Sequence, residues 1–150
     1  MARNATAASP LIAAMPAASG RSEDLNGAAE ILLVDDQEMN AAIVGRYLAH
    51  AGYTVKYLAS GDAALAALEC RPLPALIMLD VVMAGTDGLE VCRRIKSNPA
   101  TSAIPVIMVT ALDSRGDRIR AWSAGADEVL SKPVRREELV SRVGLLAGGK

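Results

Sequence analysis

Five short strand-like segments alternate with five helix-like segments between residues 30 and 146, and this alternation constrains the fold more than any other feature. The segments 31–34 and 75–79 are apolar throughout and lack the inside–outside alternation of a half-exposed strand. Strands that are apolar on both sides belong in a sheet covered by helices on both faces. The expected strands are residues 31–34, 54–58, 75–79, 105–109 and 128–130.

The segments between these runs carry apolar residues at helical spacing and end at residues that stop helices, such as Gly52 and Gly125. The expected helices are residues 38–50, a helix opening at 60–62, and residues 89–96, 115–124 and 135–146. Strands that alternate with helices in this way predict an α/β, doubly wound parallel sheet. Five units are too few for a closed barrel of eight.

The ends of the chain differ from this alternating region. Ten of the first 29 residues are alanine, and Pro10 and Pro16 would interrupt a helix there. We therefore expect residues 1–29 to form a disordered tail rather than a targeting signal, 30–146 to form the folded domain, and 147–150 to form a C-terminal tail. No stretch approaches the ~18 strongly apolar residues of a transmembrane helix.

Composition excludes several classes of function. The net charge is −1 and only 3% of the residues are aromatic, which argues against direct nucleic-acid binding. The two cysteines, Cys70 and Cys92, have neither metal-ligand spacing nor a disulfide framework. They are typical of free thiols in a reducing cytoplasm.

Polar residues stand where the expected strands end. Asp35 and Asp36 follow the first strand, Asp80 the third, Thr110 the fourth and Lys132 the fifth. Ligands of open α/β sheets bind at the carboxyl ends of the strands, so these side chains should converge. Carboxylates without a nearby histidine or thiol favour a hard ion such as Mg²⁺. A lysine and a hydroxyl beside that ion suit phosphoryl transfer.

Four segments resemble one known family. They are ILLVDD at 31–36, LDVVMAGTDG at 79–88, VIMVTA at 106–111 and GADEVLSKP at 125–133. In residue type and spacing they are similar to the receiver domain of two-component response regulators. The resemblance implies a flavodoxin-like, five-stranded parallel sheet in the order 2-1-3-4-5 with five helices.

The resemblance also implies a role for each site residue. Asp80 would accept a phosphoryl group from a histidine of a sensor kinase or a histidine phosphotransfer protein, and Thr110 and Lys132 would contact the phosphoryl oxygens. Such a domain promotes its own phosphorylation but is a switch rather than a classical enzyme. The residues implied to hold Mg²⁺ are Asp35, Asp36, Asp80 and the backbone carbonyl of Val82.

The segment 110–120 is most similar to receivers that precede diguanylate cyclase output domains. The sequence contains no such domain, so we expect either a stand-alone regulator or a receiver from a longer chain, acting on a downstream protein or output domain. Ile119, Ala121 and Ala124 are expected on the buried side of their helix, with Trp122 partly exposed. The residues expected at the partner surface are Arg115, Arg118, Trp122, Val129, Arg135 and Arg142.

The sequence departs from the family pattern at several positions. Ala84 stands where proline is common, and Val129 replaces the aromatic residue usually coupled to the threonine. Val82 and Leu112 occupy the two positions that tune the lifetime of the phosphoryl group. Because both are apolar, neither side chain can orient an attacking water, and we expect slow dephosphorylation.

Three other functions fit parts of the pattern. A haloacid-dehalogenase-type phosphatase would need a second acid where Val82 stands. A flavodoxin-like mononucleotide carrier would need a Gly/Ser/Thr-rich loop where residues 35–38 are largely acidic. A receiver acting only as an unphosphorylated interaction domain is the third alternative, and acetyl phosphate with Mg²⁺ separates it from a competent receiver.

Overall fold

The computed structural model describes residues 29–83, 87–111 and 115–147. Five strands form one sheet in the order β2-β1-β3-β4-β5, and every neighbouring pair is parallel. The predicted tail up to residue 28, Ala84 and Leu112 lie outside the described residues. The strands are β1 (Glu30–Val34), β2 (Thr54–Leu58), β3 (Leu76–Asp80), β4 (Val106–Thr110) and β5 (Glu128–Ser131).

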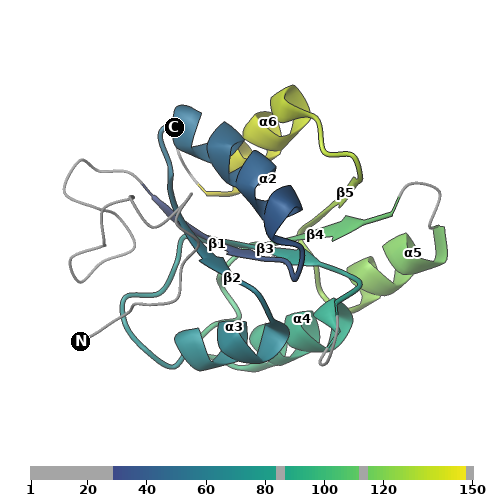
Figure 1. Cartoon of the computed structure of the whole chain (residues 1–150). Helices are drawn as coiled ribbons and strands as arrows, with labels where there is room; N and C mark the ends of the chain where they lie inside the picture. The colour runs from purple at the N-terminus through teal and green to yellow at the C-terminus, as the bar shows by residue number, and fades with distance from the viewer. Residues whose placement is uncertain (1–28, 84–86, 112–114, 148–150) are drawn as a thin grey trace.

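Five helices connect or follow these strands, which confirms the predicted doubly wound fold (Figure 1). Ser60 caps its helix as predicted, because its side chain accepts a hydrogen bond from the Ala63 amide at 3.1 Å. None of the helices in the described part of the chain is long and apolar enough to cross a membrane. The helices are α2 (Glu38–His50), α3 (Gly61–Ala67), α4 (Gly88–Ser97), α5 (Arg115–Ser123) and α6 (Arg136–Leu146).

Helices cover both faces of the sheet, as its apolar central strands predict, although Lys56 of the edge strand β2 is exposed. Figure 1 shows α2 and α6 on one face, with α3, α4 and α5 on the other. Ile31 and Leu33 belong to the core beneath α2 and α6, whereas Leu32 and Val34 belong to the opposite core. This alternation explains why β1 must be apolar at every position.

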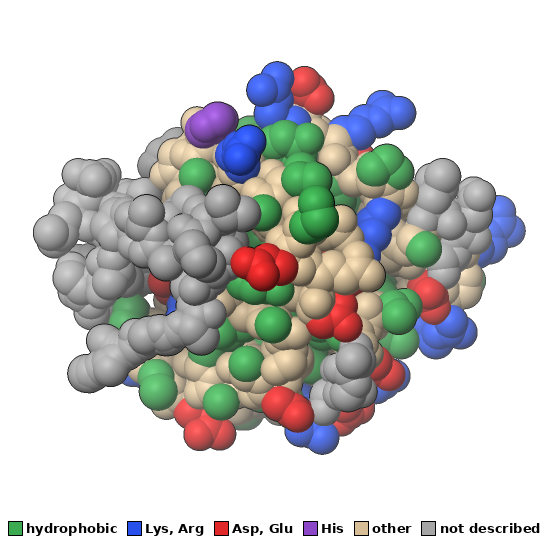
Figure 2. Space-filling model, in the orientation of Figure 1, with side chains coloured by type: hydrophobic (Ala, Val, Ile, Leu, Met, Phe, Trp, Pro, Cys, Tyr) green, Lys and Arg blue, Asp and Glu red, His purple; other side chains and the backbone are tan. Residues whose placement is uncertain are grey.

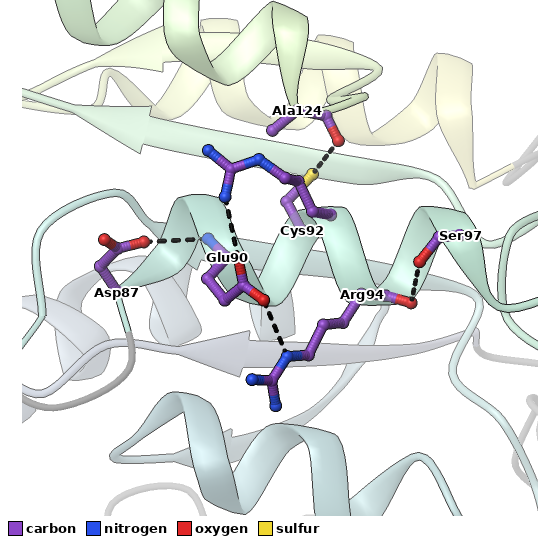
Figure 3. A network of polar contacts seen from close by, with 7 residues as sticks. Asp87, Glu90, Cys92, Arg94, Ser97 and Ala124 are labelled. Atoms are coloured by element: carbon purple, nitrogen blue, oxygen red, sulfur yellow. Dashed lines mark hydrogen bonds and ion pairs between the residues drawn. The ribbon is translucent and has the colours of Figure 1, made fainter.

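Helix α4 is fixed at both its start and its middle (Figure 3). The Asp87 side chain accepts a hydrogen bond from the Glu90 amide at 2.9 Å and so caps the helix. Glu90 pairs with Arg94 one turn later, at 2.9 Å. The buried Cys92 thiol donates to the Ala124 carbonyl, which ties α4 to the end of α5. These contacts fix the first turns of α4 and tie its middle to the residue that follows α5.

Helix α5 differs from the prediction at one residue. Ala121 and Ala124 are buried as expected, but the Ile119 side chain is 60% exposed, so its predicted burial was wrong. Residues two apart in a helix lie on nearly opposite sides. Because Ala121 lies on the buried side of α5, Ile119 faces solvent. Trp122, three residues after Ile119, shares its side and is 48% exposed, as predicted.

Candidate functional site

Three aspartates meet where the strand order reverses. Strands β1 and β3 are neighbours, although β2 lies between them in sequence, and this topology leaves a crevice at their carboxyl ends. Asp35 and Asp36 follow β1, and Asp80 is the last residue of β3. One carboxylate oxygen from each lies within 4.8 Å of the others. The predicted convergence of these side chains is therefore present.

Asp80 lies at the centre of the polar cluster and is 5% exposed. One of its carboxylate oxygens accepts a hydrogen bond from the Val82 amide at 3.3 Å. The other lies 2.9 Å from the Lys132 ammonium group. Lys132 directly follows β5, and its backbone amide donates to the Thr110 carbonyl at 2.8 Å. Asp80 thus has acidic residues on one side and a cation on the other.

Thr110 ends β4, the strand between Asp80 and Lys132. Its side chain is buried, and its hydroxyl is a buried polar atom without a hydrogen-bond partner among the described residues. Buried polar atoms are rarely left unpaired, and an exception calls for an explanation such as a missing ligand. An oxygen of a ligand bound beside Asp80 would supply that partner.

The negative charges of the three aspartates repel one another. Burial raises the pKa of the Asp35 carboxyl from 3.8 to about 6, and the charge of Asp80 acts in the same direction. The hydrogen bond from the Gln37 amide, at 2.9 Å, and the charge of Lys132 partly offset this rise. A cation among the carboxylates would remove the repulsion. The donor set contains only oxygen atoms, which fits Mg²⁺.

Two residues that support the site were not predicted from the sequence. A side-chain carbon added at Gly88 would lie 2.0 Å from the backbone oxygen of Asp80, so only glycine fits at the start of α4. The Tyr57 hydroxyl donates a hydrogen bond to the Asp35 carbonyl at 2.7 Å. The Asp87-Gly88 pair, in which Asp87 caps α4 and Gly88 begins it, is a detectable signal in the sequence. A tyrosine in a buried strand indicates only packing.

A cavity of about 470 Å³ adjoins the carboxylates. Its polar end is formed by Asp35, Asp80 and Lys132, and its remaining walls come mainly from apolar residues of the sheet, α2 and the loop after β5. Met39 and Ile43 are exposed, one turn apart on α2. Figure 2 shows hydrophobic side chains exposed on this face of the molecule. An approaching group can therefore contact apolar side chains next to Asp80.

The protein-family model of the response regulator receiver domain matches residues 31–144 of this chain. The chain belongs to this family. The match covers the whole sheet apart from Glu30, together with the three aspartates, Thr110 and Lys132. The chain is therefore a two-component receiver domain with an acidic site formed by Asp35, Asp36 and Asp80.

Individual relatives agree with this membership. The receiver is 45% identical over 115 residues to response regulator PleD of Caulobacter vibrioides, covering 77% of this chain and 25% of that protein. It is 36% identical over 114 residues to the phosphate regulon transcriptional regulatory protein PhoB of Rhizobium meliloti, covering 76% of this chain and 50% of that protein. The chain therefore spans only a quarter to a half of these relatives.

One solved structure bears on the metal. The receiver domain of the sensor histidine kinase PA1611 from Pseudomonas aeruginosa holds a magnesium ion in its active site cleft. It matches this receiver with a TM-score of 0.74 and 31% identity, over 81% of this chain and 98% of that one. In this chain, the three carboxylates of Asp35, Asp36 and Asp80 are close enough together that they could hold a metal ion.

The residues predicted for the partner surface have different surroundings. Arg115 and Arg135 are exposed, while Arg142 forms an ion pair with Glu128. Val129 is 3% exposed and packs in the core with Ala121 and Ala124, so it cannot touch a partner and its prediction was wrong. The small side chain of Ala121 allows α5 to lie close over Val129.

Proposed function

We propose that Asp80 is the phosphoacceptor of this receiver and that its donor is a histidine of a sensor kinase or phosphotransfer protein. The observation that carries the proposal is the buried Asp80 carboxylate, placed between two further aspartates and the Lys132 ammonium group. Lys132 would contact a phosphoryl oxygen, and the unpartnered Thr110 hydroxyl would donate to another. These contacts suit a transfer that depends on positioning and charge neutralisation.

In the proposed transfer, a carboxylate oxygen of Asp80 forms a bond to phosphorus as the bond between phosphorus and the histidine nitrogen breaks. The electron pair of the broken bond stays with the imidazole ring, which takes up a proton. Asp35, Asp36, Asp80 and the Val82 carbonyl would hold Mg²⁺, which when bound neutralises charge on the transferring group. The domain promotes its own phosphorylation through these groups and acts as a switch.

The donor protein would reach Asp80 through the cavity beside α2. Ile43 lines this cavity, and Met39 is exposed one turn earlier on α2. Apolar side chains of this kind can pack against a helix of the donor. We place this activity in the folded unit 30–146, in the cytoplasm, where free thiols are expected. The receiver would then act on a downstream protein or output domain.

The test is exposure of the chain to acetyl phosphate with and without Mg²⁺, followed by intact-mass measurement. We expect one added phosphoryl group per chain, formed only when Mg²⁺ is present. A stable adduct would also exclude a phosphatase, which would release the group. A chain that stays unmodified in Mg²⁺ would instead be an interaction domain, and the proposal would be wrong.

Val82 should control how long the phosphoryl group lasts. Its side chain is 66% exposed beside Asp80 and cannot orient water by hydrogen bonding. Val82→Asn should shorten the phosphoryl lifetime by roughly three- to tenfold, a small part of what a positioned polar group contributes. Phosphate release from the purified adduct measures this, with Val82→Leu as the apolar control. Equal lifetimes in both variants would contradict the mechanism.

The exposed side of α5 that carries Trp122 should change its structure on phosphorylation. Arg118, one turn before Trp122, donates to the Ser131 hydroxyl at 2.8 Å, and Ser131 precedes Lys132. A movement of Lys132 toward a phosphoryl group would therefore reach α5 through this hydrogen bond. We expect the fluorescence of Trp122, the single tryptophan, to change on adding beryllofluoride with Mg²⁺.

Asp80→Asn is the control for this measurement, because it removes the residue that the phosphoryl mimic would occupy. Its emission should not respond to beryllofluoride. In the unaltered chain, Trp122 could instead emit at the short wavelength of a buried indole and show no change on adding beryllofluoride. That result would show that the surface around Trp122 is not the output surface.

A further inference from the structure

Strand β2 holds both backbone polar groups of Asp35. The Asp35 amide donates to the Leu58 carbonyl at 3.2 Å. The Asp35 carbonyl accepts the Tyr57 hydroxyl at 2.7 Å, in a contact between residues 22 positions apart. Tyr57 is 6% exposed and Asp35 is 8% exposed, so bulk water has little access to this pair.

The Tyr57 hydroxyl acts on more than one acidic residue. The Asp35 carbonyl belongs to the peptide unit that joins Asp35 to Asp36, and a peptide unit is planar and rigid. Fixing its oxygen therefore fixes its amide nitrogen and the starting direction of the Asp36 residue. The Asp35 side chain is held separately, by the Gln37 amide at 2.9 Å. Tyr57 is thus the side chain that orients the link between two carboxylates of the triad.

The ring of Tyr57 has its own place in the core. It packs in the cluster beneath α2 and α6, opposite Leu33 of β1 in the strand register. A phenylalanine would fill nearly the same space and would keep these contacts. The hydroxyl can therefore be removed with little change in packing, which separates its role from that of the ring.

We propose that Tyr57 is a positioning residue for the cation site, because its hydroxyl sets the peptide between Asp35 and Asp36 so that both carboxylates converge with Asp80. This inference rests on the proposed function, which assigns a cation to the triad. Without the hydroxyl, the Asp35 carbonyl loses its donor and the repelling carboxylates can separate. Residues that orient metal ligands commonly influence affinity for the metal by about tenfold or more.

The experiment compares Mg²⁺ binding by the full chain and by Tyr57→Phe, using titration calorimetry, with Tyr53→Phe as the matched loss of a hydroxyl elsewhere. We expect Tyr57→Phe to weaken Mg²⁺ binding by about tenfold and Tyr53→Phe to leave it unchanged. In reactions of Tyr57→Phe with acetyl phosphate, the Mg²⁺ concentration that gives half the maximal rate should rise by the same factor as the dissociation constant. The rate at saturating Mg²⁺ should stay close to that of the unaltered chain. A purely structural hydroxyl would lower stability without moving that concentration.

Unchanged Mg²⁺ affinity in folded Tyr57→Phe overturns this inference and leaves the proposed function intact. An unaltered chain that binds no Mg²⁺ overturns both. If Tyr57→Phe does not fold, nuclear magnetic resonance of the unaltered chain provides the test instead. The resonance of the Tyr57 hydroxyl proton should show slow exchange with water and should shift on adding Mg²⁺. A hydroxyl resonance that does not respond to Mg²⁺ contradicts the proposal.

Discussion

Replacing Asp35 with asparagine should stabilise the metal-free protein while it removes Mg²⁺ binding. Burial raises the pKa of Asp35 to about 6, which means that its charged form is unfavourable in the folded chain. Asparagine keeps an oxygen that can accept from the Gln37 amide but carries no charge. The site is exposed on the side of Asp36, where solvent screens part of the cost of the buried charge. We therefore expect removal of that charge to raise the free energy of unfolding by only about 1–2 kcal/mol above pH 6.

The pH dependence follows from the same shift in pKa. Unfolded Asp35 titrates near 3.8 and folded Asp35 near 6, so between these values the folded, metal-free chain binds more protons. Its stability should therefore fall as pH rises from about 4 to about 6, and this contribution should then become level. Asp35→Asn should lack this fall, and the two chains should differ least at the acidic end.

Denaturant unfolding in a chelator, above and below pH 6, measures both effects. Mg²⁺ should stabilise the unaltered chain above pH 6 and should have little effect on Asp35→Asn, since only a folded state that binds the ion gains stability. An Asp35→Asn chain that is less stable than the original above pH 6 would show that the carboxylate is not under electrostatic strain.

Gly88→Ala should be the most damaging single-methyl change in the site. The added carbon would lie 2.0 Å from the Asp80 backbone oxygen and 3.1 Å from the Met108 side chain. The Gly88 amide also donates to the Val81 carbonyl at 3.0 Å, so α4 cannot retreat without losing that bond. We expect the free energy of unfolding to fall by about 3 kcal/mol, with loss of Mg²⁺ binding at Asp80.

Gly116→Ala on α5 is the matched control. A carbon added there meets its nearest neighbour, a nitrogen of Arg120, at 3.6 Å, which is an ordinary contact. Alanine also favours a helix over glycine, so stability should stay the same or rise by up to about 1 kcal/mol. Urea unfolding of both variants checks the pair. A Gly88→Ala chain as stable as Gly116→Ala would contradict the close approach of α4 to β3.

The strands and the meeting of the acidic residues could be predicted from the sequence, because both depend on local patterns. Continuous apolar runs indicate strands buried on both sides, and parallel strands bring their carboxyl ends to one edge. Asp35 and Asp80 could therefore be placed together from their positions after two runs. The order of the strands came from the family resemblance rather than from the pattern.

Other features depend on contacts between distant elements, which a pattern does not contain. Ile119 is exposed because the opposite side of α5, which carries the small alanines, faces the sheet. Val129 is covered because those alanines leave room for it. The hydrogen bond from Tyr57 to Asp35 joins residues from neighbouring strands and depends on their register. Neither residue type nor spacing indicated that this hydroxyl faces the site.

The most direct test of the central claim locates the phosphoryl group. The unaltered chain and Asp80→Asn would be treated with acetyl phosphate and Mg²⁺ and compared by intact mass and by mapping of the modified peptide. The account predicts one phosphoryl group on the unaltered chain, carried by the peptide that contains Asp80, and none on Asp80→Asn. An undiminished adduct on Asp80→Asn, or a phosphoryl group mapped to another residue of the unaltered chain, would contradict it.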